Sequence, residues 1–327
     1  MSDSAHSRIK PPALRSGDTV GIIAPGSNIR PDLLQAGCRE LQRLGYKTFY
    51  LDSIFDHDLY FSGSVKRRAG ELQEMFEREE VRAIICARGG YGCNYLLEEL
   101  DLSKIQRHPK IFIGYSDVTT LLTWFADAGR MITFHGPMVT KDFAADGGVH
   151  LPSWQSATSG RDAWELVFKS DSGVQPLVPG DARGTLYGGC LSMLVASLAT
   201  PYEIQTRDTI LFLEDVCAKP FQIDRMLMQL KLAGKFEGVR GLIFGEMLDC
   251  IQPGGQAYPL TEVIRRVVGD LGVPIAYGVR SGHVSRDNIT LPIGIDVALT
   301  VTADNVNLKI LESATKPAAA PASSAKS

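Results

Sequence analysis

Three residues of the types that acyl transfer requires each follow an apolar run of the sequence: Ser116, Glu214 and His283. Serine becomes nucleophilic when a base accepts its proton, histidine commonly supplies that base, and a carboxylate orients the imidazole and stabilises its charged form. Along the chain they occur in the order serine, acid, histidine. The pattern predicts a serine hydrolase, provided that the fold brings the three side chains together.

Ser116 lies in the stretch Ile-Gly-Tyr-Ser-Asp-Val, where an apolar strand is expected to run directly into a helix. A serine at such a turn presents its hydroxyl at the carboxyl end of the sheet, where the helix N-terminus favours developing negative charge. The stretch lacks the second glycine of the G-x-S-x-G nucleophile elbow. Taken alone, this stretch is better explained by a Ser116 or Asp117 side chain that only caps the helix than by a nucleophile.

A glycine-rich stretch at 88–92, Arg-Gly-Gly-Tyr-Gly, follows another expected strand. Glycines at this place let the backbone approach a ligand, and their N–H groups can bind an oxyanion or a carboxylate. The spacing matches neither the G-x-G-x-x-G fingerprint nor a Walker loop, so it does not indicate a nucleotide site. A glycine-rich turn with only a structural purpose is the alternative.

The acid and the base of the possible triad also stand at strand ends. Glu214 and Asp215 end an apolar strand, so at least one carboxylate is expected at the rim of a cleft; a solvated strand end is the alternative. His283 lies in a loop after an expected strand, and His135, at the end of another strand, could face a site. The remaining histidines fall in the N-terminal tail, polar loops or a connector: His6, His57, His108 and His150.

The elements that must position these residues alternate between strands and helices up to about residue 137. Strands are expected at 19–24, 47–51, 81–87, 111–115 and 131–134, and helices at 31–44, 64–80, 95–100 and 117–128. Continuous apolar strands separated by helices predict an α/β domain with a parallel sheet covered on both faces. In such a sheet, sites gather at the carboxyl ends of the strands.

The regular alternation of strands and helices ends after this first domain, which we assign to residues 1–140. Glycine, proline and serine punctuate residues 141–183, which we interpret as an interdomain connector with one short helix at 163–168. Residues 184–313 form a second domain of helices and strands. Residues 314–327 are rich in alanine, proline, serine and lysine and predict a disordered tail.

Composition sets limits on the function. The 327 residues carry 34 Lys and Arg against 37 Asp and Glu, a net charge of −3, which argues against a nucleic-acid partner. The six cysteines form no C-x-x-C pair and no Cys/His cluster with zinc spacing, so no metal site is predicted. The N-terminus lacks the apolar segment of a signal peptide, and no apolar run approaches the ~18 residues of a spanning helix. We therefore expect a cytoplasmic protein without membrane contact.

Over about residues 10–311 the sequence resembles the LD-carboxypeptidase family of serine peptidases. The resemblance rests on a series of motifs in the same order. These are Ile22–Ser27, Arg88–Gly92, Gly114–Asp117, His135–Pro137, Leu213–Asp215, Ile223–Leu227, Gly282–His283 and Leu291–Gly294. Each motif is common by itself, whereas the ordered series is specific.

The resemblance implies a role for each member of the triad. Ser116 is the nucleophile, His283 the general base and acid, and Glu214 the carboxylate that orients His283. The backbone N–H groups of Gly90 and Asp117 are implied as oxyanion donors.

The resemblance also implies a fold and a class of substrate. It predicts an N-terminal parallel-sheet α/β domain, a smaller C-terminal α+β domain with mixed, barrel-like strands, a site at their junction and a homodimer. The substrate is a peptide with an L,D-bond before a C-terminal D-amino acid, typically D-alanine of a muropeptide stem, and no cofactor is expected. Substrate contacts are assigned to Arg88, Gly89 and Tyr91, with Arg88 binding a carboxylate as our hypothesis from its charge.

Two departures from the family pattern bear on the substrate. Cys190 stands where the family usually has asparagine, and Arg280 and Ser281 replace the more usual aromatic residue or proline. One alternative is the family's microcin C self-immunity branch, which cleaves aminoacyl-adenylate analogues with the same triad. A second is a non-catalytic α/β ligand-binding protein, which the full set Ser116, Glu214 and His283 disfavours.

Overall fold

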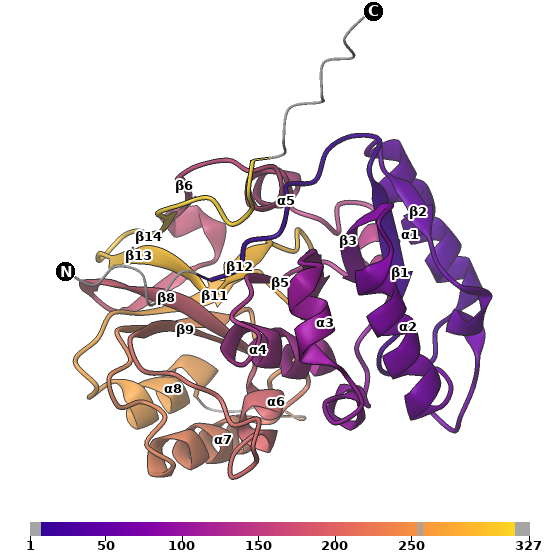
Figure 1. Ribbon diagram of the computed structural model, residues 1–327. Coiled ribbons are helices and arrows are strands. Elements are labelled where there is room, and N and C mark those ends of the chain that lie inside the picture. Colours follow the sequence, from indigo (N-terminus) through magenta and orange to yellow (C-terminus); the bar gives the residue numbers. More distant parts are fainter. Residues whose placement is uncertain (1–7, 253, 255–257, 318–327) are drawn as a thin grey trace, which may run out of the picture.

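The computed structural model describes residues 8–252, 254 and 258–317, which form two β-sheets with helices packed around them (Figure 1). The first sheet has six strands in the order β12-β5-β4-β3-β1-β2, and the second has eight in the order β6-β14-β13-β8-β9-β10-β11-β7. In Figure 1, β1 to β3 with α1 and α2 lie on one side of the molecule, and β8, β9, α7 and α8 on the other.

The first sheet is parallel except at one edge. Its strands are β1 (Thr19–Ile23), β2 (Lys47–Phe49), β3 (Val81–Cys86), β4 (Ile111–Gly114), β5 (Thr133–His135) and the late β12 (Leu291–Ile293). The helices between them are α1 (Pro31–Arg43), α2 (Val65–Glu77), α3 (Leu102–Arg107) and α4 (Thr119–Asp127). Strands β1 to β5 pair in parallel, as expected, and β12 pairs antiparallel with β5.

The second sheet is mixed, as expected. Its strands are β6 (Trp164–Phe168), β7 (Gln175–Val178), β8 (Gly180–Cys190), β9 (Thr209–Glu214), β10 (Gly241–Gly245), β11 (Ile275–Val279), β13 (Ile295–Val301) and β14 (Val306–Ile310). Four helices occur in this later part of the chain: α5 (Leu151–Thr158), α6 (Leu191–Ala196), α7 (Pro220–Leu232) and α8 (Leu260–Val268). Of these, α5 contacts β12 of the first sheet. Strands β8 to β11 are parallel to one another, and the strands at both ends of the order are antiparallel.

Single-turn helices occupy several connections. They are η1 (Asp52–Phe55), η2 (Cys93–Leu96), η3 (Ser116–Val118), η4 (Val139–Phe143) and η5 (Ser170–Ser172). The glycine-rich stretch at 88–92 lies between β3 and η2, and Ser116 is the first residue of η3, which follows β4. The first sheet therefore presents both motifs at its carboxyl edge.

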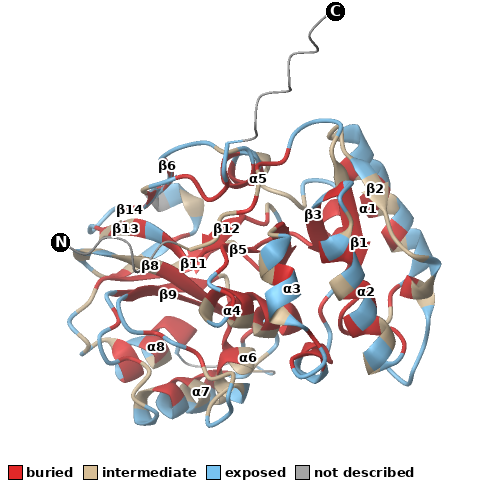
Figure 2. Cartoon of the chain, in the orientation of Figure 1, coloured by how far each residue is buried: buried red, intermediate tan, exposed pale blue. Residues whose placement is uncertain are grey.

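The two sheets share one hydrophobic core. Buried residues of both sheets, from Val20 in β1 to Ile310 in β14, form one continuous apolar cluster, and the strands are the most buried parts of Figure 2. The chain passes directly from β12 in the first sheet to β13 in the second through Gly294. This shared core fixes the carboxyl edges of the two sheets relative to each other.

The expected helix at 163–168 is wrong, because this stretch forms strand β6. Its residues alternate between buried and exposed, with Trp164, Leu166 and Phe168 inside. Alternation with a period of two suits a strand with one face on the core and not a helix. The strand pairs antiparallel with β14.

The segment 141–183 has more structure than a connector. It contributes α5, β6 and β7, and the two strands form the opposite edges of the second sheet. Helix α5 was not expected, because Pro152 looked like a break, whereas it stands in the first turn, where proline is tolerated. The remaining domain boundaries stay a prediction.

Residues 314–317, which we assigned to a disordered tail, are ordered in the structure. Thr315 is buried, and Lys316 pairs with Pro12 through a β-bridge, so residues 314–317 belong to the folded structure. The rest of that expectation, residues 318–327, lies outside the described residues.

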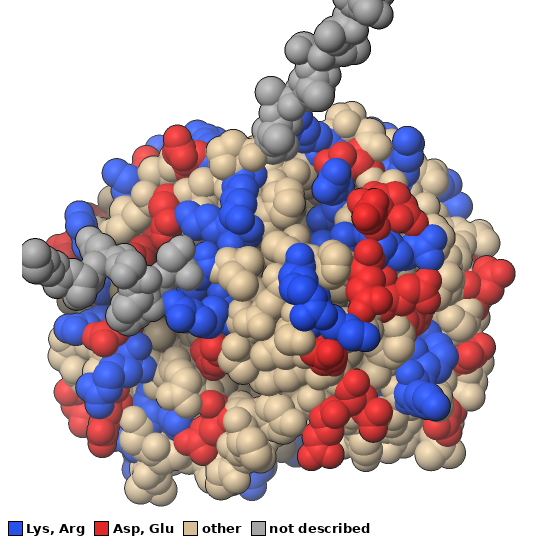
Figure 3. All heavy atoms as spheres, in the orientation of Figure 1, with Lys and Arg blue, Asp and Glu red and all other residues tan. Residues whose placement is uncertain are grey.

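Among the described residues, no helix combines the length and the apolar character needed to span a bilayer. Positive and negative side chains are interspersed over the face shown in Figure 3.

A buried arginine ties together the loops at the carboxyl edge of the first sheet. Arg68 of α2 is 1% exposed and donates hydrogen bonds to the carbonyl oxygens of Gly63, Pro25 and Gly92. The loops after β1 and β3 are thereby held side by side. Since an unpaired buried carbonyl group is costly, these hydrogen bonds from Arg68 restrict where the glycine-rich stretch can lie.

Candidate active site

Ser116 occupies the sharp turn between β4 and η3. Its φ is +64°, in the left-handed region that costs a residue with a side chain of order 1–3 kcal/mol. Neither Ser116 nor Asp117 caps the helices that follow, so the alternative of a simple capping role is not what the structure shows. Gly89 lies against the serine, because a Cβ atom at Gly89 would stand 2.8 Å from the Ser116 Cβ and 3.1 Å from its Oγ.

The carboxylate of Asp117 joins this turn to the glycine-rich stretch. It is 2% exposed and accepts a hydrogen bond of 2.8 Å from the backbone N–H of Cys93. Burial raises the pKa of Asp117, and the hydrogen bonds from Cys93 and Gly92 oppose that rise. The side chain of Asp117 therefore has a positioning role, separate from the oxyanion role that we assigned to its backbone.

The glycine-rich stretch is also fixed from the end of β1. The backbone N–H of Tyr91 donates to Ser27 Oγ at 3.1 Å, and Gly90 has a φ of +91°. A Cβ atom at Gly90 would stand 2.3 Å from the same Oγ, so this position requires glycine. The stretch is thus held between Ser27 on one side and Ser116 on the other.

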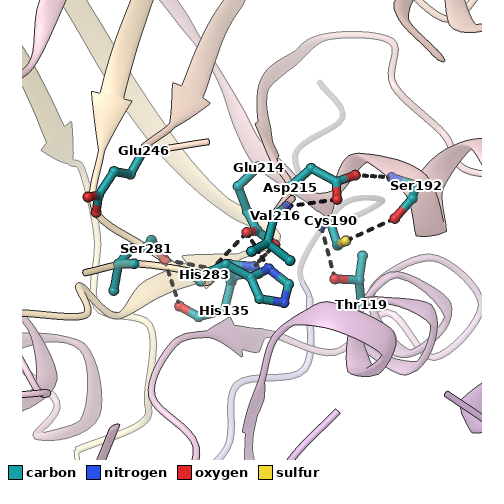
Figure 4. Close-up of polar contacts among 12 residues, drawn as sticks. Thr119, His135, Cys190, Ser192, Glu214, Asp215, Val216, Glu246, Ser281 and His283 are labelled. Carbon is teal, nitrogen blue, oxygen red and sulfur yellow. Dashed lines mark hydrogen bonds and ion pairs between the residues drawn. The ribbon is translucent and has the colours of Figure 1, made fainter. Parts of the chain in front are cut away.

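His283 and Glu214 are in direct contact. The Nδ1 atom of His283 lies 2.8 Å from Glu214 Oε2, and the backbone N–H of His283 donates to the same oxygen at 3.0 Å (Figure 4). Glu214 ends β9, while His283 lies in the loop between β11 and β12. Glu214 is completely buried, so the expectation of a carboxylate at a cleft rim does not describe it.

A second histidine contacts the other oxygen of Glu214. The Nε2 atom of His135, at the end of β5, lies 3.7 Å from Glu214 Oε1, and its Nδ1 atom lies 2.8 Å from Ser281 Oγ. Burial raises the pKa of Glu214, but the charges of His283 and His135 and the hydrogen bonds from His283 outweigh it and hold this pKa well below its usual range. The carboxylate therefore stays ionised at neutral pH despite its burial.

Ser116 and His283 line one cavity of about 440 Å³. Its other lining residues are Arg30, Leu33, Arg88, Gly89, Gly90, Tyr115, Met138, Thr140 and Lys141. Three of these side chains are cationic, and no carboxylate is among the lining residues within the described part of the chain. A cavity with a serine, a histidine and excess positive charge suits a substrate that carries an anionic group.

The structure gathers most of the residues that the sequence singled out. Arg88, Gly89 and Gly90 lie in the cavity with Ser116, whereas Tyr91 lines a neighbouring groove of about 460 Å³ with Tyr95 and Tyr202. Arg30 and Lys141 also line the cavity of Ser116 but were not expected there from the sequence. Lys141 falls in the segment that we interpreted as a connector. Its position after the end of β5, at the carboxyl edge of the sheet, could have identified it as a site residue.

Lys141 forms no ion pair among the described residues, although the carboxylate of the adjacent Asp142 is close enough for its charge to interact with the ammonium group. Its ammonium group lies 3.5 Å from the carbonyl oxygen of Val284 and 5.8 Å from the centre of the Tyr115 ring. Arg88 donates to the carbonyl oxygen of Asn28 at 3.2 Å. Arg30, by contrast, forms an ion pair with Asp32 at 2.6 Å.

Two family models cover most of the chain. The model described as the LD-carboxypeptidase N-terminal domain matches residues 20–136, and the model of the C-terminal domain matches residues 183–299. The chain belongs to the LD-carboxypeptidase family. Membership makes it a hydrolase of the carboxypeptidase type, and the resemblance inferred from the motifs is confirmed.

Similar proteins include both branches of this LD-carboxypeptidase family. A probable murein peptide carboxypeptidase of Bacillus subtilis is 38% identical over 89% of this chain and 91% of the relative. The crystal structure of a muramoyltetrapeptide carboxypeptidase from Oxalobacter formigenes is 28% identical, with a TM-score of 0.81 over 90% and 99% of the two chains. The microcin C7 self-immunity protein MccF, in complex with aspartyl sulfamoyl adenosine, is 25% identical, with a TM-score of 0.85 over 94% and 100%.

The Gly282→Ala substitution should break the contact between His283 and Glu214. Gly282 has a φ of +96°, and a Cβ atom there would stand 2.6 Å from Glu214 Cδ and 2.7 Å from His135 Cε1. We expect loss of the downfield NMR signal of the imidazole proton that His283 shares with Glu214, and a fall of about 1–3 kcal/mol in the free energy of unfolding.

Gly272→Ala is the matched control for this substitution. Gly272 has a similar φ of +70°, but nothing lies within 4 Å of its added Cβ, so the control carries the backbone strain without the collision. A Gly282→Ala protein that keeps the shared proton signal and loses no more stability than Gly272→Ala would contradict the described packing around Glu214.

Proposed function

We propose that the protein is a serine carboxypeptidase that hydrolyses an L,D-peptide bond and releases a C-terminal D-amino acid, such as D-alanine from a murein tetrapeptide in peptidoglycan recycling. The observation that carries this proposal is the shared cavity of Ser116 and His283, together with the contact between His283 and the buried Glu214. The murein and muramoyltetrapeptide carboxypeptidases among its relatives support the choice of substrate.

The reaction begins with attack of Ser116 Oγ on the carbonyl carbon of the L,D-bond, while His283 accepts the hydroxyl proton. The negative charge that develops on the carbonyl oxygen is placed near the backbone N–H groups of Gly90 and Asp117. As the intermediate collapses, His283 gives the proton to the amine of the leaving D-amino acid. Water, activated by His283, then hydrolyses the acyl-enzyme at Ser116 and restores the free serine.

Glu214 supports both proton transfers without itself exchanging a proton. Although burial raises its pKa, the charge of His283 lowers it well below the usual range, so the carboxylate is the anionic partner of the imidazolium that forms. Because the carboxylate is buried, water does not screen its attraction for the imidazolium. The hydrogen bond to Nδ1 leaves Nε2 as the atom that receives the serine proton.

The cationic side chains of the cavity explain a preference for the end of a peptide. A C-terminal carboxylate next to the scissile bond is anionic at neutral pH. Arg88 and Lys141 line the cavity with Ser116, and neither has an ion-pair partner among the described residues. We assign these two side chains to binding that carboxylate.

Ser116→Ala should abolish turnover of a murein tetrapeptide, because the nucleophile is lost. A triad that acts as a unit loses on the order of 10⁶ in kcat when its serine is removed. Mass spectrometry of the products should show release of one D-alanine by the unmodified protein and none by the folded variant. A Ser116→Ala protein with undiminished release would exclude the assigned nucleophile.

Replacement of Arg88 or Lys141 by methionine should raise KM more than it lowers kcat. One charge-assisted hydrogen bond contributes about 1.5–3 kcal/mol, which corresponds to roughly a tenfold change or more in KM. The preference of the protein for a free over an amidated C-terminus should fall by the same factor. Arg30→Met is the matched control, because Asp32 already neutralises Arg30 and a smaller change is expected. Equal effects of all three substitutions would argue against a specific carboxylate site.

A second candidate function is cleavage of peptidyl- or aminoacyl-adenylate analogues. The groove beside the glycine-rich stretch carries Tyr91, Tyr95 and Tyr202, whose rings offer surfaces on which a nucleobase could stack. The likeness to MccF in complex with aspartyl sulfamoyl adenosine supports this reading.

The relative kcat/KM values for a murein tetrapeptide and a peptidyl-adenylate distinguish the two candidate functions. Our primary proposal predicts the higher value for the tetrapeptide, and little change in that value for Tyr95→Ala. A higher value for the adenylate, lowered in Tyr95→Ala by the loss of stacking worth about 1–3 kcal/mol, would favour the second candidate.

A further inference from the structure

A cysteine stands directly beside the proposed triad. The Sγ atom of Cys190, a carboxylate oxygen of Glu214 and a ring nitrogen of His283 all lie within 4.8 Å of one another. Figure 4 shows the thiol next to the contact between Glu214 and His283. Cys190 is 3% exposed, whereas His283 lines the open cavity, so the group lies at the inner wall of the substrate site.

The backbone fixes this cysteine in place. Cys190 ends β8 and is the direct partner of Glu214 in the parallel pairing of β8 with β9. Its backbone N–H donates to Thr119 Oγ1 at 3.1 Å, while the thiol has Ser192 Oγ, at 3.3 Å, as its hydrogen-bond neighbour. The position of the sulfur therefore follows from sheet register and not from a strong bond of the thiol itself.

The thiol has no evident part in the hydrolysis. Burial, with the nearby charges of Glu214 and Asp215, raises the pKa of the Cys190 thiol well above its usual value. A neutral, buried thiol is a weak nucleophile and resists oxidation. Coordination requires a metal ion to displace the thiol proton, so the case for a metal site rests on the geometry of the three side chains and not on the pKa of the thiol.

The three side chains offer the ligand types that zinc prefers. Cysteine sulfur, histidine nitrogen and carboxylate oxygen bind Zn²⁺ at about 2.0–2.3 Å in a tetrahedral arrangement, which places ligand atoms roughly 3.5 Å apart. The observed limit of 4.8 Å is within reach of this spacing after side-chain shifts of about 1 Å. Hard cations such as Mg²⁺ and Ca²⁺ require more oxygen ligands than this group supplies.

Glu214 provides an independent observation that points to a cation. It is 0% exposed, and its Oε1 atom makes no hydrogen bond among the described residues, its neighbour being His135 Nε2 at 3.7 Å. A buried anionic oxygen without a hydrogen bond is costly, and a bound cation would satisfy it.

We propose that Cys190, Glu214 and His283 form an inhibitory binding site for a thiophilic divalent cation such as Zn²⁺. Binding converts the Cys190 thiol to a thiolate, and its proton passes to the solvent without any change in oxidation state. The bound ion occupies the imidazole and the carboxylate that hydrolysis requires, so turnover stops until a chelator removes it. The effect on turnover rests on the proposed function, whereas the binding itself does not.

Titration of the full-length protein with Co²⁺ tests the binding without any substrate. We expect a near-ultraviolet absorption band from charge transfer between the Cys190 thiolate and the cobalt ion. The band should be lost in Cys190→Ser and kept in Cys217→Ser, since Cys217 is the exposed cysteine. Absence of the band in the unmodified protein, or its persistence in Cys190→Ser, would overturn the proposal even if the substrate assignment is correct.

Inhibition by Zn²⁺ tests the effect on turnover. The unmodified protein and Cys217→Ser should be inhibited at the same Zn²⁺ concentration and recover on addition of a chelator. Cys190→Ser should require at least about tenfold more Zn²⁺, because one ligand is missing. Cys190→Asn, which carries the residue usual in the family, gives the same two readouts if the serine variant does not fold. Equal sensitivity of the folded cysteine variants to Zn²⁺ would place inhibition elsewhere.

Discussion

The contact between His283 and the buried carboxylate of Glu214 is the interaction on which the rest of the site depends. An ionised carboxylate without exposure to water is costly unless charged or hydrogen-bonding partners surround it. Here one partner is His283, at 2.8 Å, and the other is His135, at 3.7 Å. Because Glu214 ends a strand of the second sheet and His135 ends a strand of the first, the pair of sheets must be docked for the carboxylate to be stabilised.

Close backbone packing makes this docking possible. Gly282 lies against Glu214 and His135, and Gly89 lies against Ser116, with distances that leave no room for a Cβ atom. Strand β12 then joins the loop of His283 to the first sheet through the pairing of Leu291 with His135. The nucleophile and its base therefore reach one cavity from different halves of the chain, and the strained φ of Ser116 is held by its surroundings.

The sequence predicted those parts of the site that local patterns determine. Ser116, Glu214 and His283 were found because each residue follows an apolar strand, and the carboxyl ends of neighbouring strands meet at one edge. Long-range features were missed, such as the pairing of β12 with β5 and the approach of His135 to Glu214, since no local pattern encodes them. Strand β6 was mistaken for a helix because five residues are too few to separate the two periods. Burial of Glu214 depends on how the sheets dock, so the pair of acids looked like a strand end at a cleft rim.

The central claim is that Ser116, His283 and Glu214 act as one catalytic unit. The most direct measurement compares kcat for tetrapeptide hydrolysis in Ser116→Ala, in His283→Ala and in the protein with both substitutions. Groups that act only together show losses that do not multiply. The account predicts that the doubly substituted protein is no slower than Ser116→Ala alone. A loss in the double variant equal to the product of the two single losses would contradict it, because the two side chains would then act independently.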